Sequence, residues 1–185
     1  MQRSFEELPE QLLSFIQENA RKTNDFKSII ALGETSNVEF KSTLRFNLLA
    51  NKIDPVIEHA SLKTLVAFLN STGGRLIIGV NDQGEVVGLD NDKFKTPDLF
   101  QLHFWNLFRR CIGSEFSEFI KSEIVHVDNK IVFSILCKSS VKPVFLKWKA
   151  SGDAEFQELF YIRAGPQTER LSTRQIVNYI NSHFN

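Results

Sequence analysis

The sequence contains little cysteine and no long apolar run, and each shortage excludes a class of protein. Cys111 and Cys137 are far apart and lie in apolar stretches, so we expect two reduced, buried thiols rather than a disulfide framework or a C-x-x-C metal site. No apolar stretch approaches the length of a bilayer span, and residues 1–7 lack the apolar core of a signal peptide. These absences predict a cytoplasmic protein with no membrane partner.

An excess of charge of one sign is also missing. The 185 residues carry 22 basic and 22 acidic side chains, so the formal net charge at pH 7 is 0. A neutral molecule has no overall attraction for phosphate, which argues against tight non-specific binding to DNA. Any surface that meets nucleic acid must therefore be local.

Two further site types lack their usual residue patterns. The four histidines are scattered, with no paired helical spacing and no accompanying C-x-x-C, so we expect no zinc site. Gly73-Gly74 is followed by an apolar strand and lacks the Lys-Ser/Thr ending of a P-loop. We therefore expect these glycines to end a helix and allow close backbone packing rather than to hold a nucleotide.

What the chain does contain is ordinary globular composition, with 42% hydrophobic and 24% charged residues. Its 17 phenylalanines are spread from Phe5 to Phe184, so most should be divided among the core faces of many elements. The simplest organisation is an N-terminal amphipathic helix and linker over residues 1–29, followed by one domain over residues 30–185. The helical apolar spacing lies between Leu8 and Ile16, whereas residues 19–27 are polar and predict a loop.

Local patterns in the domain predict an α+β fold with a mixed, mainly antiparallel sheet and flanking helices. Pro55 and Pro97 open two apolar helical stretches, and Ser172 with Gln175 has the spacing of a capping box. Asp128-Asn129 joins two strand-like runs as a hairpin turn. The predicted helices are 55–69, 97–112 and 173–184, and the predicted strands are 37–41, 75–80, 85–89, 123–127, 130–138, 144–148 and 158–163.

Four blocks in order make the sequence specific: Gly33–Lys41, Leu65–Gly74, Leu76–Gly88 and Phe160–Gly165. Together they resemble the AlbA-like domain of the Schlafen family, which also occurs in many bacterial regulators. The resemblance covers roughly residues 30–185. It implies an α+β fold in which a strand bearing Glu-Phe-Lys packs beside a helix and a glycine-bounded hairpin, and a role in binding RNA or DNA.

The resemblance also implies a candidate catalytic site. Some Schlafen relatives cut structured RNA with three carboxylates, and the matching positions are Glu34, Glu39 and Asp82, although Asn81 or Glu85 could equally take the third place. Clustered carboxylates can hold Mg²⁺ or Mn²⁺, which activates water and stabilises charge on phosphate. The zinc motif of vertebrate Schlafens is missing, and the resemblance supports binding more firmly than catalysis.

Basic and aromatic residues supply candidate contacts to nucleic acid. Lys41, Arg45, Lys52 and Lys63 could form a local basic path beside the carboxylates, or they could be ordinary solvated charges. Arg163 is a further candidate for a phosphate contact, with a surface ion pair as the alternative. Trp148, flanked by two lysines, is a candidate for base stacking.

These residues support two functional hypotheses. The first is a bacterial-type module that binds RNA or DNA, with a metal-dependent ribonuclease as the enzymatic version of the same site. The second is a non-catalytic interaction platform, in which the N-terminal helix or a Phe-rich surface joins the domain to a partner protein or to a second copy. The neutral net charge fits the second.

Overall fold

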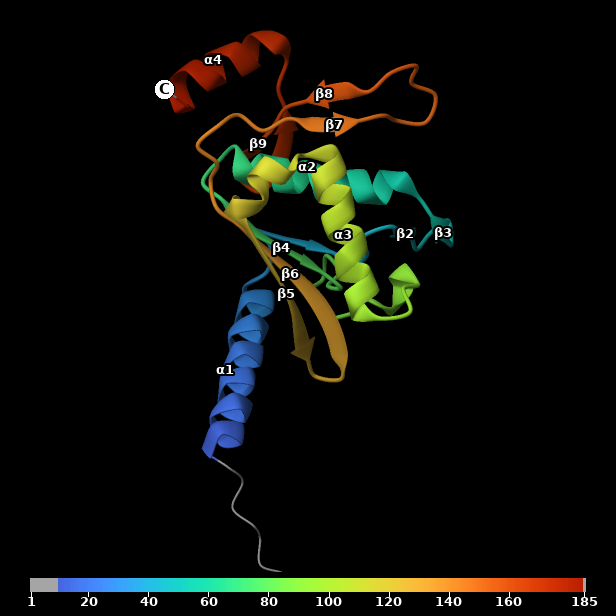
Figure 1. Ribbon diagram of the computed structural model, residues 1–185, viewed down its shortest axis with the longest axis vertical. Coiled ribbons are helices and arrows are strands. Elements are labelled where there is room, and N and C mark those ends of the chain that lie inside the picture. The colour runs from blue at the N-terminus through green and yellow to red at the C-terminus, as the bar shows by residue number, and fades with distance from the viewer. Residues whose placement is uncertain (1–9, 185) are drawn as a thin grey trace, which may run out of the picture.

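A computed structural model describes residues 10–184, and its centre is a four-stranded sheet (Figure 1). The strands are β1 (Val38–Lys41), β4 (Gly74–Ile78), β5 (Ile120–Val127) and β6 (Lys130–Cys137), in the order β1-β4-β6-β5. β1 runs parallel to β4, and β6 is antiparallel to both β4 and β5. The predicted mixed, mainly antiparallel sheet with flanking helices is confirmed.

Two helices cover one face of this sheet: α2 (Pro55–Leu69) and α3 (Pro97–Cys111). Each begins as predicted with a proline in its first turn, and the side chain of the preceding Asp54 or Thr96 accepts a backbone N–H of that turn. Between the helices and the sheet lies the larger core, whose fully buried rings include Phe68, Phe104 and Phe133. The expected distribution of phenylalanine over the core is therefore found.

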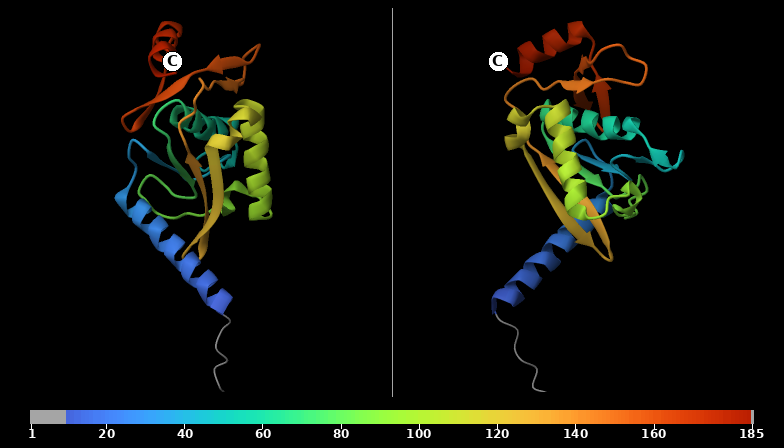
Figure 2. Two further views of the ribbon diagram at one scale, coloured as in Figure 1. Left: turned by 60° about the vertical axis from the view of Figure 1, so that its left-hand side comes forward. Right: turned by 45° about the vertical axis from the view of Figure 1, so that its right-hand side comes forward.

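The opposite face of the sheet is covered by α1 (Glu10–Leu32), as the left view of Figure 2 shows. α1 is one continuous helix, so the predicted loop over residues 19–27 is wrong and the predicted boundary after residue 29 falls within a helix. Phe26 and Ile30 pack beside Phe40 and Ile77 in a second core, and this tertiary contact outweighs the polar local sequence. Leu8, one residue of the predicted apolar stripe, lies outside the described residues.

Short antiparallel pairs and a last helix complete the fold (Figure 1). The predicted strand over residues 158–163 is interrupted at Phe160, and the predicted strand 85–89 is reduced to one bridge between Val80 and Val86. The capping box of Ser172 and Gln175 is confirmed. The elements are β2 (Phe46–Asn47) with β3 (Lys52–Ile53), β7 (Leu146–Trp148) with β8 (Gln157–Leu159), β9 (Tyr161–Ala164) with β10 (Gln167–Arg170), the 3₁₀ turns η1 (Asp90–Asp92) and η2 (Ser114–Phe119), and α4 (Thr173–His183).

The glycine pair after α2 does what the sequence predicts. Gly73 has φ +82°, and a Cβ there would lie 2.6 Å from the carbonyl oxygen of Cys137. A Cβ on Gly74 would lie 2.4 Å from the Phe68 ring. The pair therefore ends the helix and lets β4 enter the sheet in close contact with it.

Cys111 and Cys137 are free and buried, as predicted. Burial raises the pKa of the Cys137 thiol, which keeps it protonated and inert. Within residues 10–184, the longest helices fall short of the length or the apolar character that crossing a membrane requires.

Candidate nucleic-acid interface

Arg163 is an internal cross-link. Its side chain is 4% exposed, and its guanidinium lies over the Phe68 ring, 5.0 Å from the ring centroid. All five N–H donors of the guanidinium are used within the chain. They reach Ser36 O (3.1 Å), Thr35 O (3.1 Å), Pro166 O (2.8 Å), Thr168 Oγ1 (3.1 Å) and Glu39 Oε2 (3.0 Å). Arg163 thus joins the start of β1 to the β9–β10 hairpin and has no donor left for the predicted phosphate contact.

Glu39 and Lys41 are also engaged. Lys41 Nζ lies 2.6 Å from Glu39 Oε1 and 2.9 Å from Phe40 O, and the Glu39 side chain is only 16% exposed. The sequence predicts a solvent-facing side of β1 for both. Instead that side meets Arg163, because the β9–β10 hairpin packs over it. Lys41 is consequently partly neutralised as a phosphate contact.

The three predicted metal ligands are not gathered by the fold. Glu34 Oε1 accepts the backbone N–H of Phe40 at 2.7 Å and so closes the turn before β1. Asp82 is exposed in the turn after Val80, where Asn81 bonds Glu85 instead. Across residues 10–184, no three His, Cys, Asp or Glu side chains are placed to hold a metal ion together. As they stand, Glu34, Glu39 and Asp82 do not fit a shared Mg²⁺ or Mn²⁺.

Arg45 packs on the η1 turn. Its guanidinium carbon lies 3.5 Å from the Phe94 ring centroid, while Nε donates to Asp92 O at 2.9 Å and Nη2 to Lys93 O at 3.2 Å. These contacts fix the Arg45 side chain against its own domain. Its predicted role at a phosphate is therefore secondary to a structural one.

Asp92 is a structural residue that sequence reasoning missed. It is fully buried, and its carboxylate accepts the backbone N–H groups of Leu44 (2.8 Å), Arg45 (2.8 Å) and Phe46 (3.1 Å). Burial raises the pKa of Asp92, and these three hydrogen bonds oppose that rise. An aspartate in a polar turn gives no signal of this role, because its partners lie far away in the sequence.

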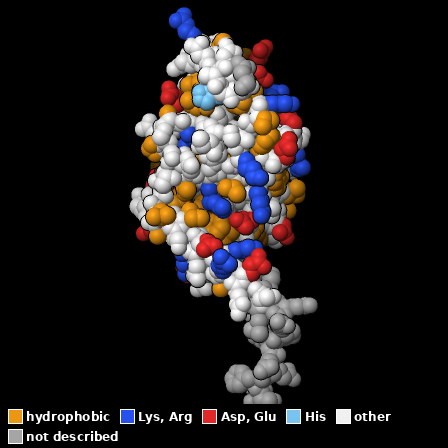
Figure 3. All heavy atoms as spheres, turned by 90° about the vertical axis from the view of Figure 1, so that its left-hand side faces the viewer, with side chains coloured by type: hydrophobic (Ala, Val, Ile, Leu, Met, Phe, Trp, Pro, Cys, Tyr) orange, Lys and Arg blue, Asp and Glu red, His pale blue; other side chains and the backbone are white. Residues whose placement is uncertain are grey.

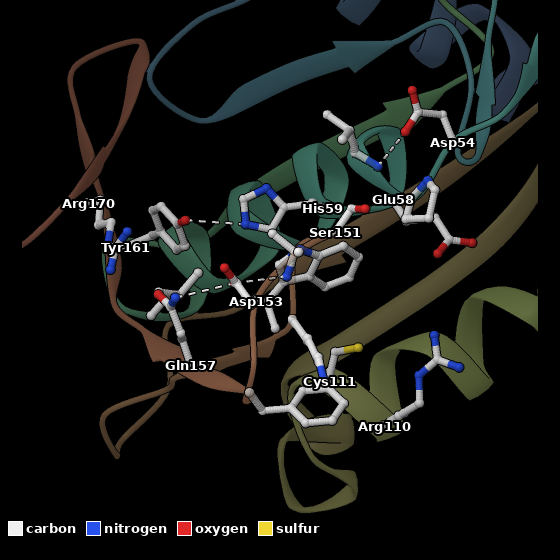
Figure 4. A pocket seen from close by; sticks show the side chains of 18 residues that line it. Asp54, Glu58, His59, Arg110, Cys111, Ser151, Asp153, Gln157, Tyr161 and Arg170 are labelled. Carbon is white, nitrogen blue, oxygen red and sulfur yellow. Dashed lines mark hydrogen bonds between the residues drawn. The ribbon is translucent and has the colours of Figure 1, made fainter.

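The two other residues predicted to contact nucleic acid, Lys63 and Trp148, both lie near His59. Lys63 is one helical turn after His59 on α2, so both lie on the same side of that helix. The His59 and Trp148 rings are 5.0 Å apart, and the Tyr161 hydroxyl lies 3.3 Å from His59 Nε2. Trp148, His59 and Tyr161 line a cavity of about 940 Å³ between α2, the end of α3 and the β7–β8 hairpin (Figure 4). We call this cavity the Trp148 groove.

Lys63 and Arg170 place positive charge near His59. The pKa of His59 is lowered first by burial and then by the charges of Lys63 and Arg170. Neither Lys63 nor Arg170 makes a side-chain hydrogen bond or ion pair to another residue in the described range 10–184. His59 and Arg170 were not predicted as site residues, although the four-residue spacing of His59 and Lys63 was a usable signal.

Acidic side chains also line the groove, but each is already bonded. Asp54 accepts from Asn47 Nδ2 and from the backbone of Val56. Glu58 lies 2.7 Å from His103 Nε2, and Asp153 accepts from the backbone of Ala150 and from Gln157 Nε2. These hydrogen bonds hold the acidic side chains in place, and their charges stand beside those of Arg110, Lys149 and Arg170 in the same lining.

Elsewhere the surface is mixed. On the face drawn in Figure 3, Lys and Arg side chains alternate with Asp, Glu and apolar side chains. This pattern agrees with the zero net charge of the sequence.

Known proteins share the fold. Solved structures include the DIP2311 protein of Corynebacterium diphtheriae, with a TM-score of 0.52 at 15% identity over 81% of this chain and 24% of that one, which shows a shared fold. The N-terminal domain of a RecG-related protein of Nitrosomonas europaea gives a TM-score of 0.47 at 19% identity over 73% and 87% of the two chains.

A curated relative and a family model extend the comparison. A Ureaplasma parvum protein, described as an uncharacterised ATP-binding protein, is 27% identical over 159 residues, which are 80% of this chain and 42% of that protein. The chain therefore spans less than half the length of this relative. The family model described as Schlafen, AlbA_2 matches residues 34–172, most of the chain. The resemblance of the four sequence blocks is confirmed, and the chain belongs to the Schlafen AlbA_2 family.

Proposed function

We propose that this domain binds nucleic acid, RNA or DNA, through the Trp148 groove. The observation that carries the proposal is that Arg170 lines the groove with the rings of His59, Trp148 and Tyr161, and that Lys63 follows His59 by one turn of α2. Cations next to aromatic faces form the common recognition surface for nucleic-acid strands, because the cations attract phosphate and the rings attract bases. Membership in the Schlafen AlbA_2 family supports the same reading.

The charge arrangement explains how a neutral protein could bind a polyanion. Attraction to phosphate depends on local potential, and two free cations in a partly enclosed groove are screened less than charges on an open surface. Binding of this kind should be modest in affinity and should weaken as the salt concentration rises, because releasing counterions into more concentrated salt gains less free energy. The site is accordingly suited to a module that acts beside other domains or partners.

The proposal is tested by titrating labelled short RNA and DNA with the protein and with two variants. Lys63→Ala/Arg170→Ala removes the two cations nearest to His59, and the matched control Lys121→Ala/Arg21→Ala removes one lysine and one arginine that are exposed on β5 and α1. We expect the groove variant to bind at least about tenfold more weakly and the control to match the wild type. Equal loss in both variants would place binding elsewhere.

A protein-interaction platform is the second candidate function, and one apolar surface favours it. Leu48, Leu49 and Ile53 on the β2–β3 hairpin are exposed, as is Val56 at the start of α2. Exposed apolar groups that lie together often mark interaction sites. If the domain associates with a second copy through this surface, Leu49→Ser/Val56→Ser should lower the mass that light scattering measures at high protein concentration. Oligonucleotides should then not bind.

Metal-dependent cleavage of RNA remains a separate hypothesis. Glu34 and Glu39 argue against cleavage, because each carboxylate already accepts hydrogen bonds from the chain. Cleavage would require these contacts to open.

A further inference from the structure

We propose that the Trp148 groove receives one unpaired nucleobase of a single strand, stacked on the Trp148 ring, with the adjoining phosphate toward Lys63 and Arg170. This inference rests on the proposed function and specifies its ligand. A base can stack only where its face is free, so a groove of this kind selects unpaired over paired nucleotides.

The aromatic floor of the groove is held in place before any ligand arrives. Trp148 is half-buried, packs against the larger core and is paired through β7 with Gln157 of β8. His59 is tilted 46° to the Trp148 ring, and Tyr161 meets His59 edge to face, with the hydroxyl 3.3 Å from His59 Nε2. Because these rings are anchored on α2, β7 and β9, stacking on them costs little conformational entropy.

The groove is large enough to admit a nucleotide. About 940 Å³ lies in the usual range of small-molecule sites, about 300 to 1,000 Å³. The β7–β8 loop forms one wall, where Figure 4 shows Ser151 and Asp153 beside the rings. A hydroxyl and a carboxylate can bond the edge of a base, whereas a duplex would present only edges that are already paired.

The charges favour a strand over a free mononucleotide. Figure 4 shows Arg170 beyond Tyr161 at one end of the groove and Arg110 on α3 at the other. A strand that passes over Trp148 carries a phosphate on each side of the stacked base, so it can meet both arginines. A mononucleotide carries its phosphates on one side and can meet only one.

The test uses tryptophan fluorescence. The chain has two tryptophans, and Trp105→Phe leaves Trp148 as the sole reporter. Full-length protein with this substitution is titrated with an octanucleotide single strand, an abasic strand of the same length, a blunt duplex and AMP. We expect the single strand to quench Trp148 fluorescence and to bind at least about tenfold more tightly than the other three, as expected for one stacked base.

Two variants separate stacking from folding. Trp148→Phe keeps an aromatic face and Trp148→Leu keeps apolar volume without one, so we expect binding of a labelled single strand to survive the first substitution and to fall about tenfold in the second. Circular dichroism confirms that both remain folded. Equal affinities of the two variants would overturn the stacking.

The remaining outcomes are equally decisive. If the abasic strand binds as tightly as the normal strand, or the duplex does, the inference of a base fails while phosphate binding by Lys63 and Arg170 stands. If AMP binds as tightly as the strand, the ligand is a mononucleotide and the inference of a strand is overturned. If no nucleic acid or nucleotide binds, the inference and the proposed function both fail.

Discussion

The carboxylate of Glu39 and the guanidinium of Arg163, 124 residues apart in the chain, lie 3.0 Å from each other in a nearly dry setting. The pair joins β1 to the β9–β10 hairpin, and the other four donors of Arg163 strengthen the same junction. The junction also holds Tyr161, the first residue of β9, at the edge of the Trp148 groove. Any function of the groove should therefore depend on this junction being intact.

Replacing Arg163 by lysine should destabilise the protein although the charge is kept. Lysine offers three donors from one point and cannot reach five acceptors, so buried carbonyl groups lose their partners. We expect the free energy of unfolding to fall by about 2–4 kcal/mol in urea denaturation. Arg170→Lys, an exposed position on β10, is the control and should change it by less than about 0.5 kcal/mol. An Arg163→Lys protein as stable as the wild type would show that the junction is dispensable.

The buried carboxylate of Asp92 leads to a second prediction about stability. Removing its carboxylate with Asp92→Ala leaves the N–H groups of Leu44, Arg45 and Phe46 without acceptors, two of them in buried hydrogen bonds. The free energy of unfolding should drop by about 3 kcal/mol or more. Asp90→Ala, two residues earlier and exposed, is the matched control and should have little effect. Equal effects of the two substitutions would contradict the bonding role of Asp92.

His59 predicts a pH dependence of stability. Its pKa in the folded protein is below the ordinary 6.5, first because of burial and then because of Lys63 and Arg170. The unfolded chain then binds more protons than the folded protein as pH falls through 6.5, so this contribution lowers the free energy of unfolding toward acid pH. Urea midpoints of the wild type and His59→Gln, measured from pH 7.5 to 5, should diverge on the acid side, with the wild type losing more stability. A difference that stays constant over this range would refute the lowered pKa.

The carboxylate hypothesis can be examined with structured RNA in Mn²⁺ or Mg²⁺. Because Glu34, Glu39 and Asp82 are not gathered around one position, we expect no metal-dependent cleavage that depends on them. The comparison is between the wild type, Glu34→Ala/Glu39→Ala and the control Glu118→Ala/Glu155→Ala, which changes exposed residues. Cleavage by the wild type and the control that disappears only in the first variant, with its circular dichroism unchanged, would favour the ribonuclease.

Local sequence patterns predicted most of the fold because they depend on neighbouring residues. The starts of α2 and α3, the β5–β6 hairpin and the capping box of α4 all follow from prolines, turn residues and apolar spacing within one element. The length of α1 could not be predicted from local patterns, because Phe26 and Ile30 are stabilised in a helix by strands that come later in the chain. Polar local sequence cannot report such a contact.

The candidate site was predictable only in part, for the same reason. Residue type singled out Lys63 and Trp148 as separate candidates for contact with nucleic acid, and nothing in the sequence showed that both lie near His59. Arg163 was misread because an arginine with five internal acceptors looks, in a sequence, like an arginine that faces solvent. Glu34 likewise serves a backbone N–H six residues away, a use that spacing does not reveal.

The most direct measurement of the central claim is the salt dependence of single-strand binding. The logarithm of the association constant should fall linearly with the logarithm of salt concentration, with a slope of about 0.7 for each phosphate neutralised. For Lys63→Ala/Arg170→Ala the slope should decrease in magnitude by about 1 to 1.5, while Lys121→Ala/Arg21→Ala keeps the wild-type slope. A slope that is the same in all three proteins would contradict the assignment of phosphate binding to the Trp148 groove.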